Sequence, residues 1–211
     1  MTAPMTAAEF QAASGVSDDA LARFEAYLAL LTTWQRRINL VGAASLKDPW
    51  RRHFLDSAQV APLLPAAARV VCDIGSGAGF PGLVLAILGR GDGRQYLLVE
   101  SNARKCAFLG EANRITGAGA IIHNKRIEKL SGISADAVTA RAIAPLKKLM
   151  EYANLVLKKG GQCLFLKGRG WREELTAAEK NWIMKESHFA SISDPTGSIL
   201  KLEAISRRDR S

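Results

Sequence analysis

The stretch Asp73-Ile74-Gly75-Ser76-Gly77-Ala78-Gly79-Phe80-Pro81-Gly82 decides the fold of this 211-residue chain. It follows a short apolar run and precedes a segment with helical spacing, so it predicts a tight connection from a strand to a helix. Glycine adopts positive φ without strain and lets a ligand lie against bare backbone. The amides of a helix that begins there can also face that ligand. Four glycines in this stretch favour a ligand-binding turn over a purely structural one.

Outward from this turn, short apolar runs alternate with helical segments. Such alternation is typical of a parallel sheet with helices on both faces. Near the end, two apolar runs flank a Pro195-Thr196-Gly197 turn with no helix between them, which predicts a terminal hairpin. We therefore expect an α/β fold: a Rossmann-like sheet with a terminal antiparallel hairpin, preceded by an N-terminal helical cap. The predicted strands are Val70 to Ile74, Tyr96 to Val99, Ala120 to Ile122, Ala137 to Thr139, Gln162 to Leu166, Ser187 to Ser193 and Ile199 to Ile205, and the helices between them are Pro81 to Leu88, Ala103 to Arg114 and Leu146 to Leu157.

The first 65 residues have a different pattern, which is helical throughout. Ser17-Asp18-Asp19 predicts a helix start, because a serine can cap a helix and acids favour its first turn. Asp48-Pro49 predicts a second start, and Pro62 and Pro65 end that helix. We expect a helical cap over residues 1–65, a cofactor-binding domain over 66–206 as one compact unit, and a basic tail over 207–211.

Composition and charge bound the class of protein. Hydrophobic residues make up 48% of the chain, yet no stretch approaches the ~20 apolar residues that span a bilayer. Residues 1–10 lack the pattern of a secretory signal, so we expect a cytoplasmic protein that binds no membrane. The three cysteines are far apart and indicate neither a disulfide framework nor a metal site. The net charge of +9 favours a polyanionic partner, and nucleic acid in particular.

The glycine turn and the next strand end together indicate the cofactor. Glu100 ends the second predicted strand, where a carboxylate can accept hydrogen bonds from both ribose hydroxyls of a nucleoside. A dinucleotide site requires GxGxxG, whose third glycine would fall at Phe80. The chain instead has GxGxG preceded by Asp73, an acid that suits a methionine ammonium and would repel a pyrophosphate. We therefore expect a class I methyltransferase sheet that binds S-adenosylmethionine. An NAD(P)-dependent oxidoreductase and a non-catalytic RNA-binding protein are the alternatives.

The motifs that the chain lacks limit which kind of atom would accept the methyl group. None of its cysteines follows a proline, as attack by a cytosine ring carbon would require, and no Asn/Asp-Pro-Pro-aromatic loop for exocyclic amines is present. A ring nitrogen such as guanine N7 carries a lone pair and no proton, so it needs no general base. The sequence is compatible with such a nucleophile.

Several motifs in this order resemble the RsmG (GidB) family of bacterial small-subunit ribosomal RNA guanine-N7 methyltransferases. The resemblance covers about residues 34–168. It departs from the family at Val41 (usually Thr), at Glu100 (often Asp) and at Ala140 (usually Ser). The motifs that carry the resemblance are Trp34-Gln35-Arg36-Arg37-Ile38-Asn39-Leu40, Arg52-His53-Phe54-Leu55-Asp56-Ser57, the stretch from Asp73 to Gly82, Glu100-Ser101-Asn102-Ala103-Arg104-Lys105, Arg141-Ala142-Ile143-Ala144 and Lys167-Gly168.

The resemblance implies formation of 7-methylguanosine in 16S ribosomal RNA, free or in the small subunit, with S-adenosylmethionine as donor and no metal. It implies that Ile127 and Glu128 flank the adenine and that Arg141 lies by the methionine end or the substrate. We expect a monomer, and which guanine is methylated stays open. The expected cofactor-binding residues are Asp73, Gly75, Gly77, Gly79, Phe80, Glu100, Ser101, Ile127, Glu128 and Arg141; the expected RNA-binding residues are Arg52, His53, Lys167 and Arg169.

Arg141 and Lys167 are the expected catalytic residues. Both follow strand ends on the side where open α/β sheets bind ligands. His53 lies three residues before Asp56, so the two could form a structural bond on one helix face, or His53 could act at the mouth of the site. We do not expect His53 to be a catalytic base. Trp171 and Trp182 could stack on bases, although packing is the commoner use of tryptophan.

Overall fold

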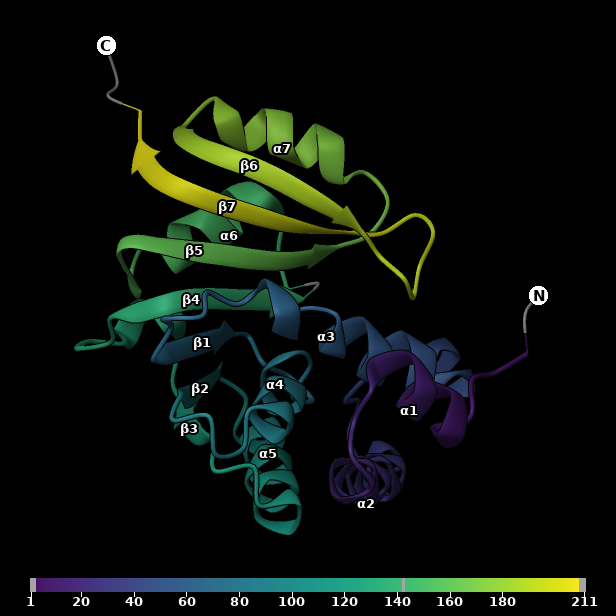
Figure 1. The fold of residues 1–211 in the computed structure, drawn as a ribbon. Helices are drawn as coiled ribbons and strands as arrows, with labels where there is room; N and C mark the ends of the chain where they lie inside the picture. Colours follow the sequence, from purple (N-terminus) through teal and green to yellow (C-terminus); the bar gives the residue numbers. More distant parts are fainter. Residues whose placement is uncertain (1–2, 142, 209–211) are drawn as a thin grey trace.

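The computed structural model describes residues 3–141 and 143–208 and places one seven-stranded sheet at the centre of the molecule (Figure 1). The strand order is β3-β2-β1-β4-β5-β7-β6. The first five strands are parallel, and β7 runs antiparallel between β5 and β6. The predicted parallel sheet with a terminal antiparallel hairpin is therefore confirmed. The strands are β1 (Val70–Ile74), β2 (Gln95–Glu100), β3 (Ile121–Asn124), β4 (Ala135–Arg141), β5 (Leu157–Lys167), β6 (Trp182–Ala190) and β7 (Ser198–Arg207).

Helices cover both faces of this sheet. In β2, Tyr96 and Leu98 pack into one hydrophobic core, whereas Leu97 and Val99 pack into a second core on the other face. Side chains of a strand alternate between faces, so a sheet buried on both sides reads as a continuous apolar run. The helices are α1 (Ala7–Ser14), α2 (Asp18–Gln35), α3 (Asp56–Ala58), α4 (Gly82–Leu88), α5 (Ala103–Thr116), α6 (Leu146–Ala153) and α7 (Trp171–Glu179), and shorter helical turns are η1 (Ala43–Lys47), η2 (Trp50–Leu55, of π type), η3 (Ala61–Leu63) and η4 (Ile127–Lys129).

The N-terminal cap belongs to the first of these cores and lies beside α4 and α5 (Figure 1). As predicted, α2 begins after Ser17, whose side chain accepts a hydrogen bond from the amide of Ala20. Aromatic rings bind the cap elements together, with Phe24 5.4 Å from Phe10 and 5.5 Å from Phe54 between ring centres. The predicted boundary at residue 65 falls between η3 and β1, and the cap and the sheet share one hydrophobic core across it.

The bounds of α1, inside the predicted helical cap, and the whole of α7 were not predicted from the sequence. Helix α1 starts at a reciprocal cap, in which the Thr6 side chain and the Glu9 side chain each accept the other residue's backbone N–H. Helix α7 lies against α6 on the face opposite the cap. It begins after Gly170 and buries Trp171. Trp171 and Trp182 are both buried, so these tryptophans serve packing.

The strand bounds differ from the predictions mainly at β5 and in the hairpin. Strand β5 starts at Leu157 and not at 162, because Gly160 at φ +79° accommodates an irregularity in the pairing with β4. Strand β6 spans 182–190 and not 187–193, because residues 191–197 leave the sheet and bond to the cap. Strand β7 reaches Arg207, so the predicted tail begins inside the sheet, and its residues 209–211 lie outside the described part of the chain.

Within 3–141 and 143–208, no helix has both the length and the hydrophobicity required to cross a bilayer. The same residues contain no group of three or more histidine, cysteine or acidic side chains placed to hold a metal ion.

Candidate active site

A cavity of about 740 Å³ lies at the carboxyl ends of the parallel strands, between the sheet and the cap. Open α/β sheets bind ligands at this edge, and pockets for small molecules have volumes of this order. Several separate parts of the chain line it: the glycine turn, the ends of β2, β4 and β5, the cap, and the loop between β6 and β7. Among the lining residues are Val41, Ser45, Arg52, His53, Asp56, Gly75, Ser76, Gly77, Phe80, Glu100, Ser101, Lys105, Arg141, Ile143, Lys167, Ser193 and Asp194.

The glycine turn has the backbone conformation that the sequence predicted. Gly75 and Gly77 have φ of +67° and +56°, a region that other residues rarely adopt. A Cβ on Gly77 would meet no heavy atom nearer than 3.8 Å, so this position opens onto the cavity. At Gly75 a Cβ would meet the Ile143 side chain at 2.6 Å, so only glycine lets the loop after β4 approach.

Glu100 lies at the end of β2 and its carboxylate is tied to the glycine turn. Its Oε2 accepts the N–H of Gly77 at 3.0 Å, and its Oε1 accepts the N–H of Asn102 at 2.7 Å. Two backbone donors therefore fix the orientation of the carboxylate beside the cavity. The structure brings Gly75, Gly77, Glu100 and Ser101 together on one wall, as expected from the sequence.

Asp73 is not among the residues that line the cavity. It is 1% exposed and lies beneath the turn, where Oδ1 accepts the hydroxyl of Thr139 at 2.8 Å. Its Oδ2 is buried and has no hydrogen-bond partner among the described residues. Burial raises the pKa of this carboxyl to about 6, against the opposing effect of the bond from Thr139. A buried acceptor without a partner next to a ligand turn is suited to a cationic group.

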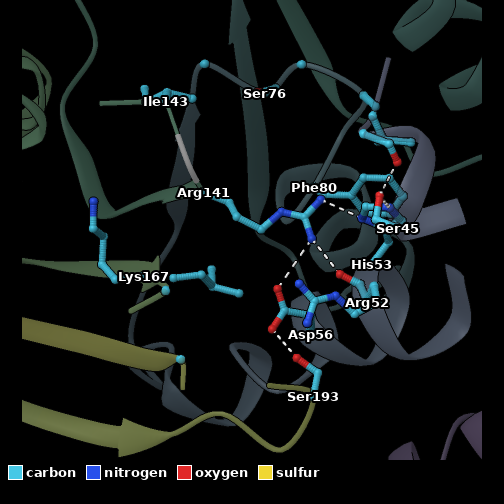
Figure 2. Close-up of a pocket in the computed structure, with 18 of the residues that line it drawn as sticks. Ser45, Arg52, His53, Asp56, Ser76, Phe80, Arg141, Ile143, Lys167 and Ser193 are labelled. Atoms are coloured by element: carbon cyan, nitrogen blue, oxygen red, sulfur yellow. Dashed lines mark hydrogen bonds and ion pairs between the residues drawn. The ribbon is translucent and has the colours of Figure 1, made fainter. Parts of the chain in front are cut away.

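Arg141, at the end of β4, reaches across the cavity to the cap (Figure 2). Its Nη1 donates to the carbonyl oxygen of Arg52 at 2.9 Å and lies 3.3 Å from Asp56 Oδ2, and its Nη2 donates to Nδ1 of His53 at 2.9 Å. The guanidinium also lies 4.9 Å from the centre of the Phe80 ring. The pairing of His53 with Asp56 considered from the sequence is absent; both residues bond instead to Arg141.

Phe80 joins the glycine turn to the cap. Its ring stacks between His53, at 4.8 Å and 23° between planes, and Tyr27, at 5.3 Å and 12°. The Tyr27 hydroxyl donates to the carbonyl oxygen of Ala78 within the turn. A third glycine at this position, as a dinucleotide site requires, would remove the stack. Phe80 therefore fixes the shape of the turn from the cap side.

Lys167 lines the cavity, but its ammonium group is directed elsewhere. Its Nζ lies 2.7 Å from Glu174 Oε2 on α7 and donates to the carbonyl oxygen of Ala144 at 3.1 Å, and its side chain is 7% exposed. Glu174 also accepts the N–H of Leu146 at the start of α6. The ammonium charge of Lys167 is therefore paired and holds the loop after β4. The catalytic and RNA-binding roles expected for Lys167 stay predictions.

The loop between β6 and β7 closes one side of the cavity, which the sequence did not indicate. Asp56 Oδ1 accepts the hydroxyl of Ser193, and Asp194 lies 3.0 Å from Arg52 (Figure 2). Gln59 accepts the N–H of Ile192 at 3.0 Å. These contacts join residues more than 130 positions apart. The only sequence signal is the polar composition of residues 191–197, which is also ordinary for a turn.

Four other predicted residues lie outside the described lining of the cavity. At Gly79, a Cβ would clash with the Tyr27 hydroxyl, so this glycine serves the packing of the turn. Ile127 is buried in the second core, and Glu128 and Arg169 are exposed on the surface. Ala142, in the motif around Arg141, lies outside the described residues. The roles expected for these four positions stay predictions.

The arrangement of these groups suits binding and alignment better than acid–base chemistry. Burial, followed by the charges of Arg141 and Arg52, lowers the pKa of His53 to about 3, so this imidazole is neutral at physiological pH. Burial raises the pKa of the Cys72 thiol to about 12 and also raises that of Cys163, so neither is a thiolate nucleophile. The cavity offers fixed hydrogen-bonding groups, a carboxylate at one end and a guanidinium at the other.

Comparison with known proteins gives close matches over most of the chain. A family model described as rRNA small subunit methyltransferase G matches residues 20–199. A ribosomal RNA small subunit methyltransferase G of Rhodospirillum rubrum is 54% identical over 203 residues, which cover 96% of this chain and all of that protein. A protein of the same name from Paramagnetospirillum magneticum is 52% identical, covering 92% of this chain and 93% of that one.

Solved structures share the fold at low sequence identity. An O-methyltransferase from Bacillus cereus, solved in complex with SAH, superimposes with a TM-score of 0.59 at 12% identity, covering 93% of this chain and 97% of that one. At such identity the likeness concerns the fold alone.

Proposed function

The chain belongs to the rRNA small subunit methyltransferase G family, and from this premise we propose that it methylates guanine N7 in 16S ribosomal RNA with S-adenosylmethionine as the methyl donor. The proposal rests on one observation: the Glu100 carboxylate is hydrogen-bonded to the glycine turn, and both line the cavity. The net charge of +9 supports a polyanionic substrate.

The residues of the site fit this cofactor. Gly77 leaves open space above the turn, and Glu100 can accept from the ribose hydroxyls. When bound, S-adenosylmethionine supplies a methyl group activated by the positive sulfonium. The fit accounts for one wall of the cavity and leaves the side near the cap and the loop 191–197 for the RNA.

The protein's own part in the reaction is orientation. Guanine N7 attacks through its lone pair and has no proton to lose, so no residue must act as a base. In-line displacement then depends on holding the nucleophile in position. Arg141 lies between the two halves of the cavity with its charge partly offset by Asp56. We assign Arg141 to hold an oxygen acceptor of a ligand, and Lys167 to support the loop that carries Arg141 and Ile143.

Incubation of the purified protein with isotopically labelled donor and 16S RNA from cells that lack the protein tests the proposal directly. We expect label in one guanine, located by mass spectrometry as 7-methylguanosine. Free RNA and assembled small subunits are tested separately as substrates. Binding of RNA without transfer of the labelled methyl group would indicate a non-catalytic RNA-binding protein. A melting temperature raised by NAD(P) but not by S-adenosylmethionine would indicate an oxidoreductase.

The cofactor wall is tested by Glu100→Ala. Loss of an acceptor for two hydroxyls should weaken S-adenosylmethionine binding about tenfold to a hundredfold in calorimetry. Glu25→Ala, at an exposed position of α2, is the matched control and should bind as wild type does. Unchanged affinity in a folded Glu100→Ala protein would remove Glu100 from this role.

Two further statements belong to the same proposal. A ribosomal RNA substrate supports a cytoplasmic location, with which the unpaired Cys72, Cys106 and Cys163 agree. We also propose that the working unit is a monomer. Sedimentation of the protein at micromolar concentration, with and without RNA, measures this oligomeric state.

A further inference from the structure

His53 lies at the centre of the contacts between the cap and Arg141, in a geometry that fixes its protons. Guanidinium groups only donate hydrogen bonds, so Nδ1 of His53, 2.9 Å from Arg141 Nη2, must present its lone pair. The proton of the neutral ring is then on Nε2, which lies 2.9 Å from Ser45 Oγ and donates to it. Both ring nitrogens are thereby committed, one as acceptor and one as donor (Figure 2).

The surroundings of this ring oppose a second proton. His53 is 5% exposed and stacks on Phe80, with Tyr27 on the far side of that ring. The charged groups that act on its pKa are Arg141 and Arg52, both cationic, and Asp56 bonds to Arg141. Burial together with these cations keeps the imidazole neutral, with a pKa of about 3.

What His53 supplies is therefore a fixed acceptor for Arg141. The bonds to the carbonyl oxygen of Arg52 and to Asp56 both use Nη1, so His53 is the described partner that holds Nη2. These three bonds and the contact with the Phe80 ring fix the plane of the guanidinium. Its Nε–H and one N–H of Nη2 make no hydrogen bond to a described residue. Those two groups are what Arg141 can offer to an oxygen atom of a ligand.

We propose that His53 is a positioning residue for methyl transfer: as a neutral acceptor it fixes the Arg141 guanidinium toward the cavity and carries no proton in the reaction. The role rests on the proposed function, since it concerns the alignment of substrate and donor. A proton carrier would require a titrating imidazole with a free nitrogen, and this one has neither.

The paired substitutions His53→Asn and His53→Gln separate this role from packing. Both remove the stack on Phe80, but the asparagine amide oxygen can take the place of Nδ1 and accept from Arg141. The longer glutamine places its amide near Nε2 and leaves Arg141 without that acceptor. We expect kcat of the asparagine variant within about threefold of wild type, and a loss of about tenfold to a hundredfold for glutamine. Equal impairment of the two variants at equal melting temperatures would overturn the proposal.

Separate measurement of kcat, of KM for RNA and of Kd for S-adenosylmethionine shows whose oxygen Arg141 holds. A loss of cofactor affinity in the glutamine variant identifies the donor, and a rise in KM for RNA identifies the substrate; either result supports the positioning role. Unchanged values of all three constants in His53→Gln would contradict it.

Nitrogen-15 NMR of histidine in the full-length protein gives a readout that does not depend on activity. The His53 signals, assigned by their loss in His53→Asn, should show the neutral ring with Nε2 protonated from pH 8 to pH 5. Protonation of His53 near pH 6.5 would overturn the proposal even if RNA methylation is observed. Failure of the wild-type protein to methylate RNA would instead refute the proposed function and leave the NMR result on His53 unchanged.

Discussion

At the residue scale, the two acids near the glycine turn have opposite environments. Glu100 is held by two backbone N–H groups, whereas Asp73 is fully buried with one oxygen unpartnered. Hydrogen bonds stabilise a carboxylate and burial destabilises it. The charged form of Asp73 is therefore destabilised by burial beneath the turn.

Asp73→Asn should stabilise the free protein in a pH-dependent way. Because the pKa of about 6 in the folded state exceeds the ordinary value of 3.8, wild-type stability falls as the pH rises from 4 to 6. Above pH 6 the cost amounts to about 3 kcal/mol, which the asparagine variant avoids. We expect urea unfolding to show the variant more stable at pH 8, with the difference vanishing near pH 4, and weaker binding of S-adenosylmethionine.

Asp136→Asn is the control, because the pKa of Asp136 is shifted in the opposite direction to that of Asp73. Burial acts to raise the pKa of Asp136, but bonds from Lys158 and from the amides of Val70 and Arg69 outweigh it and lower the pKa. The charged form therefore stabilises the fold at neutral pH, and the asparagine variant should be less stable at pH 8. Equal pH profiles for the two variants would contradict the environment assigned to Asp73.

Gly82→Ala tests the packing between the glycine turn and α4. A Cβ on Gly82 would meet the buried Asp73 side chain at 2.5 Å, so we expect destabilisation of about 1–3 kcal/mol in urea unfolding. The control is Gly110→Ala in α5, where a Cβ would meet nothing within 4 Å. That variant should gain up to about 1 kcal/mol from helix propensity. A stabilised Gly82→Ala protein would show that Asp73 does not pack as described.

At the scale of elements, one ion pair holds the loop after β4 between two helices. Glu174 on α7 accepts from Leu146 at the start of α6 and pairs with Lys167 at the end of β5. The loop in between carries Ile143, which lies over Gly75. The wall of the cavity is therefore set by a contact on the face of the sheet opposite the cap.

Glu174→Gln should lower the free energy of unfolding, because it removes the charged partner of the nearly buried Lys167 ammonium. Without its partner charge the lysine is poorly solvated, and we expect a loss of about 1–3 kcal/mol in urea unfolding. Glu173→Gln, at the exposed neighbouring position, should change stability little. Lys167→Met should reduce the effect of Glu174→Gln in a double-mutant cycle. Additive losses would mean that the two side chains do not interact.

At the scale of the whole molecule, the site depends on the cap and the sheet sharing one core. The Phe80 ring lies between cap residues, and the loop between β6 and β7 bonds to the cap at Asp56 and Gln59. The net charge of +9 acts at this scale as well, because it attracts a polyanion to the molecule before any specific contact forms.

RNA binding should therefore weaken steeply with salt. If six or more phosphates are contacted, affinity should fall about a thousandfold or more between 50 and 200 mM salt. Affinity for S-adenosylmethionine, measured in the same buffers, should change little and serves as the control. Filter binding or fluorescence anisotropy gives both slopes, and a flat dependence for RNA would argue against a polyanionic substrate.

Local patterns in the sequence were enough to predict several features of the fold and of the site. The glycine turn requires positive φ at Gly75 and Gly77, and the alternation of apolar runs with helical segments specifies the parallel sheet and its hairpin. Glu100 was placed at the end of β2 by the same pattern. These signals are readable because each depends on the backbone preferences and burial of neighbouring residues.

The other half of the site is assembled by contacts between distant parts of the chain, which the sequence did not predict. Arg141 meets Asp56 across 85 positions, and Asp56 meets Ser193 across 137. Lys167 was expected to face a ligand, yet its charge is paired with Glu174 on another element. No local pattern specifies such pairs, because they arise only when the packing of cap, sheet and hairpin brings distant polar groups into a space from which water is largely excluded.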